Sequence, residues 1–126
     1  MANQLPGKTV ILSIKGGCKG DDCYWSAKFD QGFEGTHTLT GADMKKNVSE
    51  MELSALIVGL SVIELGSHVI VKTRNQNIVS TMTDWIKRWK KNNWQRKSGK
   101  PIQNKVLWQE VDKLTANLLI TWSLVK

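Results

Sequence analysis

The chain has 126 residues, of which 40% are hydrophobic and 23% are charged, and its formal net charge is +7. This length fits one compact domain over residues 1–126, and the apolar share excludes a disordered chain. The excess of Lys and Arg favours a polyanionic partner, namely nucleic acid or an acidic membrane or protein surface. A solvated surface that is merely basic is the alternative.

Nothing in the sequence predicts a membrane span or a signal peptide. The longest apolar stretch, residues 53–65, contains three polar side chains and is too short to cross a bilayer. We therefore expect a cytoplasmic protein without a membrane partner. Two cysteines, Cys18 and Cys23, do not imply a disulfide framework in a reducing compartment. We expect neither a metal ion nor a cofactor.

A three-stranded antiparallel meander opens the predicted fold. A β-branched run predicts a strand at 10–14, and the glycines and aspartates of 16–22 predict a turn after it. Two further strands, 24–29 and 33–39, are joined by the short connection 30–32.

Helices and parallel strands follow the meander. Apolar residues at helical spacing predict a helix from a cap at Asn47 or Ser49 to Leu65, and Gly66 ends it. The remaining elements are a strand at 68–73, short helices at 76–82 and 84–91, a polar loop at 92–103, a helix at 104–115 capped by Asn104, and a strand at 117–125. A strand, a helix and a strand in succession indicate a parallel crossover. We therefore predict an α/β (α+β) fold with a mixed five-stranded sheet.

A basic, tryptophan-rich segment, residues 85–103, is the most informative part of the sequence. No acidic residue lies between Asp84 and Glu110. Lys and Arg can neutralise phosphates, and Trp can stack on bases or pack against sugars. The alternative is that these tryptophans are core anchors and the cations a solvated face. The candidate nucleic-acid contacts in this segment are Trp85, Lys87, Arg88, Trp89, Lys90, Lys91, Trp94, Arg96, Lys97 and Lys100.

The same segment carries a family resemblance. Trp85-Ile86, Trp89-Lys90-Lys91, Trp94, Gly99-Lys100-Pro101-Ile102, Asn104 and Leu107-Trp108 resemble the basic protrusion and following helix of bacterial-type (type 1) ribonuclease H. Met51-Glu52-Leu53 resembles the family's first helix, and Gly16-Gly17-Cys18 resembles the end of its first strand. Gln76 and residues 120–126 also match. The resemblance spans residues 10–126 and implies a ribonuclease H-like fold without the family's final helix.

The resemblance also implies a catalytic site, from which this chain departs. The family cleaves RNA in RNA–DNA hybrids with two Mg²⁺ or Mn²⁺ ions held by carboxylates. Only Glu52 matches these carboxylates, since Lys15 and Arg74 stand where the family has aspartates. An ammonium and a guanidinium cannot coordinate Mg²⁺. We therefore expect a degenerate site, a pseudoenzyme without nuclease activity.

Two hypotheses concern these three residues. Lys15 and Arg74 hold a backbone phosphate in place of the metals, or they form an internal ion-pair network with Glu52. For the duplex itself, the resemblance implies backbone and sugar contacts from Gln76, Trp85, Asn104 and the lysines.

The strand at 117–125 bears on protein partners. The family's final helix covers one face of the sheet, and without it we expect apolar side chains from Leu118, Ile120, Trp122 and Leu124, or from Leu119 and Val125, to lie open. Such area marks an interface, so we predict a homodimer or a protein partner there.

Three functions follow as hypotheses. The first is an inactive module that binds RNA–DNA hybrid or another duplex. The second is a protein-interaction or regulatory module that uses the same scaffold to bind a replication, transcription or nuclease partner. The third is an enzyme completed by another chain, which Lys15 and Arg74 disfavour.

Overall fold

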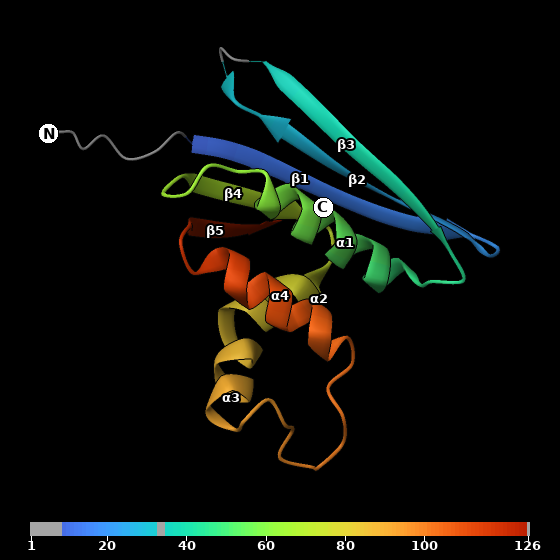
Figure 1. Ribbon diagram of the computed structural model, residues 1–126, viewed down its shortest axis with the longest axis vertical. Coiled ribbons are helices and arrows are strands. Elements are labelled where there is room, and N and C mark those ends of the chain that lie inside the picture. Colours follow the sequence, from blue (N-terminus) through green and yellow to red (C-terminus); the bar gives the residue numbers. More distant parts are fainter. Residues whose placement is uncertain (1–8, 33–34, 126) are drawn as a thin grey trace, which may run out of the picture.

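The computed structural model describes residues 9–32 and 35–125, which form one five-stranded sheet with helices beside it (Figure 1). The strand order is β3-β2-β1-β4-β5. β1 pairs antiparallel with β2 and parallel with β4, β2 pairs antiparallel with β3, and β4 pairs parallel with β5. The predicted mixed sheet is confirmed. The strands are β1 (Thr9–Lys19), β2 (Asp22–Asp30), β3 (Thr36–Met44), β4 (His68–Thr73) and β5 (Leu119–Leu124).

The first hairpin is longer than the sequence predicts. Gly16 and Gly17 do not turn the chain but pair with Trp25 and Tyr24, and the turn follows at Gly20. Residue 17 is a glycine within the strand because the Tyr24 ring lies over it. A Cβ on Gly17 would lie 2.5 Å from the Tyr24 hydroxyl oxygen. The predicted start of the third strand at residue 33 lies outside the described residues.

The hairpin holds a disulfide that the sequence does not predict. Cys18 and Cys23 face each other across β1 and β2, with Cα atoms 4.0 Å apart, and their sulfurs are bonded. The expectation of unpaired cysteines is therefore wrong. The pairing register decides this, since it places the two residues opposite each other.

The long helix follows β3 in the chain, packs on β1 and β2, and leads to β4. Helix α1 (Val48–Ser61) starts with a capping box, in which the Asn47 side chain accepts from the Glu50 amide and the Glu50 side chain accepts from the Asn47 amide. After β4, α2 (Gln76–Ser80), a π-helical turn η2 (Thr81–Trp85) and α3 (Ile86–Lys91) follow one another without a break, where the sequence predicts two helices. Helix α4 (Lys105–Thr115) precedes β5.

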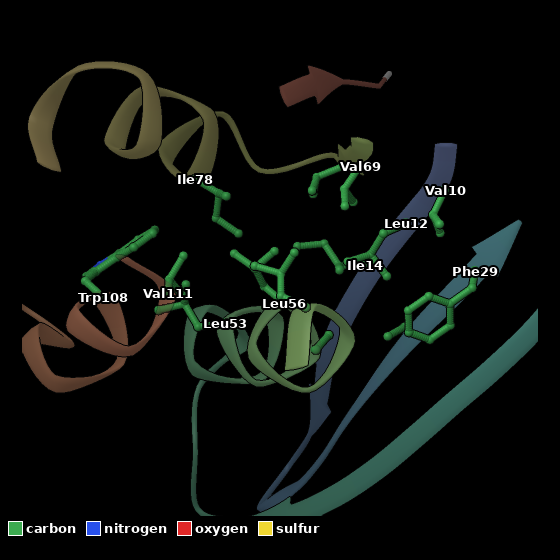
Figure 2. Packing of buried hydrophobic residues seen from close by; sticks show 14 of the residues in the cluster. Val10, Leu12, Ile14, Phe29, Leu53, Leu56, Val69, Ile78, Trp108 and Val111 are labelled. Atoms are coloured by element: carbon green, nitrogen blue, oxygen red, sulfur yellow. The ribbon is translucent and has the colours of Figure 1, made fainter. Parts of the chain in front are cut away.

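The core lies between the sheet and α1 and α4 (Figure 2). Val10, Leu12 and Ile14 alternate along β1 on the buried face, and Leu53 and Leu56 of α1 meet them from the helix side. Residues i, i+2 and i+4 of a strand share one face, so the intervening side chains point to the other face. Among the described residues, no helix is long and apolar enough to cross a membrane.

The predicted open apolar face is found in part. Leu118, Ile120 and Trp122 are partly buried against the core, because Ile120 and Trp122 pair with Val69 and Val71 on the helix-covered side. Leu119 and Leu124 are exposed singly. The homodimer or protein partner at this strand stays a prediction.

Candidate nucleic-acid interface

A cleft of about 340 Å³ opens beside the basic segment. The start of α1, the run from α2 to α3, and the start of α4 form its walls. Its lining combines indole rings, amides, hydroxyls and one guanidinium. The lining residues are Ser49, Leu53, Asn75, Asn77, Ile78, Ser80, Thr81, Trp85, Trp89, Arg96, Ile102, Gln103, Asn104 and Trp108.

The tryptophans of the segment divide into two groups. Trp108 is buried, and Trp89 packs between it and Trp94, with ring centroids 6.4 Å and 6.3 Å away. Trp85 is 47% exposed and carries the Arg88 guanidinium 5.1 Å from its ring centroid. Trp89 and Trp94 therefore anchor the segment to the core, and Trp85 is the ring that a ligand can reach.

The π-helical turn explains how two neighbouring tryptophans reach different environments. A π turn adds a residue to the helical repeat and shifts the side chains that follow it. Here the turn ends at Trp85, while Ile86 is buried and starts α3. Trp85 thereby lies at the mouth of the cleft, and Ile86 fastens the helix to the core.

The cations of the segment differ in whether they line the cleft or form ion pairs. Arg96 lines the cleft, whereas Arg88 is 3.4 Å from Asp84 and Lys90 is 3.2 Å from Asp112 in exposed ion pairs. Lys87 and Lys91 lie two residues before and after Trp89, so they point to the opposite side of α3. Lys97 and Lys100 are exposed and do not line the cleft.

Asn104 does not cap α4 as predicted. Its backbone is left-handed, with φ 59° and ψ 32°, and its side chain makes no capping hydrogen bond. Asn tolerates this conformation better than most residues. Asn104 lines the cleft, and its role in ligand contact stays a prediction. Gln76, by contrast, donates to Ser80 Oγ at 2.9 Å and does not line the cleft.

Asn75 is a residue that sequence reasoning missed. Its side-chain oxygen caps α2 by accepting from the Asn77 amide at 2.9 Å, and its Nδ2 donates to Glu52 Oε1 at 2.9 Å. It also lines the cleft. An Asn two residues after a strand and one before a helix is a typical N-cap, which was the available signal.

The backbones of Lys15 and Arg74 lie side by side at one edge of the sheet, and Glu52 is near this edge. The Lys15 side chain points to the face away from α1, which carries Glu52. The β1–β4 register ends at Ser13 and Lys72, and continuing it by two residues places Lys15 beside Arg74. Glu52 is close to this point, since a Cβ on Gly16 would lie 3.0 Å from Glu52 Cγ. Within residues 9–32 and 35–125 neither cation is ion-paired with Glu52, so this structure does not form the ion pairs of the second hypothesis.

This donor set does not fit a pair of divalent metal ions. Mg²⁺ and Mn²⁺ take oxygen ligands, and carboxylates supply both the ligand and the charge. Among the described residues Glu52 is the one carboxylate at this edge, and one of its oxygens accepts from Asn75. Lys15 and Arg74 are exposed cations that offer donors only.

Comparisons with known proteins agree on one family. The family model described as RNase H matches residues 13–126. Ribonuclease H of Hydrogenovibrio crunogenus is 36% identical over 120 residues, covering 93% of this chain and 81% of that protein. Ribonuclease HI of Neisseria meningitidis serogroup B is 33% identical over 121 residues, covering 94% and 83%.

Solved structures show the same fold. LC9-RNase H1, a type 1 RNase H with the type 2 active-site motif, superposes with a TM-score of 0.85 at 21% identity, over 98% of this chain and 65% of that one. A foamy viral protease–reverse transcriptase in complex with dsDNA superposes with a TM-score of 0.73 at 12% identity, over 94% and 81%.

These relatives overturn one expectation from the sequence. Proteins 32–36% identical over more than nine-tenths of the chain are named ribonuclease H, which indicates an enzyme. The prediction of a chain that is not an enzyme is therefore contradicted. It rested on the missing metal-binding carboxylates, two of which are replaced by Lys15 and Arg74, and gave no weight to the similarity over the rest of the chain.

Proposed function

Because the chain belongs to the ribonuclease H family, we propose that it binds duplex nucleic acid, and RNA–DNA hybrid in particular, across the cleft beside the basic segment. The observation that carries the proposal is the convergence of the exposed Trp85 ring, the Arg96 guanidinium and the Asn104 amide on one cleft. A guanidinium suits a phosphate, an indole suits a sugar or base, and an amide suits either.

The cleft favours recognition of the backbone over recognition of base sequence. Its polar groups come from Asn, Gln, Ser and Thr side chains, which serve phosphate and sugar oxygens as well as base edges. Lys87, Lys91, Lys97 and Lys100 are exposed cations of the same segment that do not line the cleft, and they add positive potential to this part of the molecule. Binding that rests on backbone contacts is selective for duplex shape and depends steeply on salt.

We further infer that Lys15 and Arg74 hold a backbone phosphate of the same duplex. Both are exposed, and among the described residues neither is ion-paired with an acid. Their backbones meet at the end of two parallel neighbouring strands. A Lys15→Glu, Arg74→Glu variant is expected to bind hybrid more weakly, and Lys15→Arg, Arg74→Lys, which keeps both charges, is expected to retain affinity. Equal affinity of the two variants would exclude this role.

Fluorescence anisotropy with labelled 20-mers tests the proposal. The protein is titrated into RNA–DNA hybrid, double-stranded RNA, double-stranded DNA and single strands, each over a range of salt and with Mg²⁺ or Mn²⁺ present. Hybrid binding that weakens with a steep salt slope supports the proposal. Absence of duplex binding at low salt contradicts it. A denaturing gel of the same samples reads hydrolysis of the RNA strand, so binding and cleavage are scored separately.

A further inference from the structure

The face of the sheet that points away from α1 and α4 carries lysines and hydroxyls together with apolar side chains. Ile11, Ile70 and the exposed Leu119 lie on it, as does the acid Asp30. Because side chains alternate along a strand, Ser13 and Lys15 of β1 point to this face, while Leu12 and Ile14 point into the core. The same parity holds across the other strands. The members of this open face on β1, β2, β4 and β5 include Ser13, Lys15, Tyr24, Ser26, Lys28, Lys72, Thr121 and Ser123, and none of them is buried.

The register aligns two of its lysines in one row. Ser13 pairs with Lys28 on one side and with Lys72 on the other. Neighbouring strands lie about 4.8 Å apart, so the two lysine backbones are about 10 Å apart across β1. Asp30 lies on the same face, two residues after Lys28 on β2, where it pairs with Ile11. Among the described residues, neither Lys28 nor Lys72 forms an ion pair.

Tyr24 gives this face an accessible aromatic ring. It is 49% exposed, and it lies across Gly17, where a Cβ would come within 2.6 Å of Cζ. The glycine therefore lets the ring lie low over the strand. Tyr24 is four residues from Lys28 on β2, a distance of about 14 Å along the strand, with Lys15 paired to Ser26 between them.

We propose that this open face binds single-stranded nucleic acid, with phosphates on Lys28 and Lys72 and a base stacked on Tyr24. A flat sheet with lysines, hydroxyls and a half-exposed ring meets the two needs of a single strand, which are charge along its backbone and a surface for stacking. A duplex keeps its bases stacked inside, so its bases cannot reach Tyr24. The duplex cleft is formed by the helices on the other side of the sheet. Lys15, which is assigned above to a duplex phosphate, lies at the edge of this face and is therefore left unchanged in the variants that test it.

Anisotropy titration of the full chain with labelled oligo(dT) and oligo(rU) tests the charge contribution. Each phosphate contact contributes about 0.7 to the salt slope of a single strand. Lys28→Gln, Lys72→Gln should therefore lower the slope by about 1.4 and the affinity at 0.1 M salt by about 25-fold. Lys105→Gln, Lys113→Gln removes the same charge from exposed positions on α4 and should have a much smaller effect. Equal losses from the two double variants overturn the proposal.

The ring is tested at the same time. Tyr24→Leu keeps an apolar side chain over Gly17 but cannot stack, and it should lower single-strand affinity at least about fivefold, while Tyr24→Phe retains it. Circular dichroism confirms that each variant is folded. If Tyr24→Leu binds like Tyr24→Phe, the stacking assignment fails. If Lys28→Gln, Lys72→Gln weakens RNA–DNA hybrid as much as the single strand, the face binds duplexes and the proposal is overturned. Arg96→Gln tests the duplex cleft independently of this face.

Discussion

Replacing Arg96 by Gln removes the one cation among the described residues that line the cleft. If the guanidinium neutralises one phosphate of a hybrid, its loss should lower the slope of log K against log salt by about 0.9. The same relation gives the loss of affinity, which is about 0.9 decade, or about eightfold, at 0.1 M salt and about threefold at 0.3 M salt. The effect should therefore shrink as salt rises.

Lys97→Gln is the matched control. Lys97 is the next residue in the chain, it is exposed, and it does not line the cleft, so the same charge is lost outside the site. The assay is anisotropy of a labelled 20-base-pair hybrid at five salt concentrations. A smaller loss for Lys97→Gln than for Arg96→Gln is expected. An unchanged salt slope for Arg96→Gln, or the same loss for both variants, would refute the reasoning.

Three further outcomes are expected. Trp85→Leu should weaken hybrid binding by roughly 1–3 kcal/mol in the same titration while leaving the melting temperature nearly unchanged, because the ring is half exposed; a large drop in melting temperature would instead make it a core residue. Leu56→Ala should lower the free energy of unfolding in urea by about 2–5 kcal/mol, since Leu56 is fully buried, and a loss below about 1 kcal/mol would contradict this packing. Reduction of the Cys18–Cys23 disulfide should lower the free energy of unfolding by about 2 kcal/mol, a modest loss because the closed loop is short. Identical urea midpoints with and without reductant would show that the bond is not formed.

The fold follows from local patterns to a large extent. The β-branched runs and the apolar spacing of α1 predict their elements because each element buries one side. The Gly16-Gly17 pair misleads, since glycines favour turns locally but here leave room for the Tyr24 ring on a neighbouring strand. The disulfide and the buried side of β5 depend on strand register, which a single strand's pattern does not contain.

The candidate site is predictable in outline only. Composition singles out the basic segment, but it cannot separate Trp85 from Trp89 and Trp94, because their exposure depends on the π-helical turn and on packing against Trp108. Composition also cannot tell which cations of the segment form ion pairs, since the acid can be distant in sequence, as Asp112 is from Lys90.

Titration of the indole N–H resonances with RNA–DNA hybrid tests the binding cleft most directly. The chain has six tryptophans, each with one indole N–H in a proton–nitrogen correlation spectrum. Trp85 should shift first and most strongly, because it is exposed at the cleft, while Trp122, which packs against the core from β5, should not move. A titration in which Trp85 stays unchanged while the hybrid is bound would contradict the account.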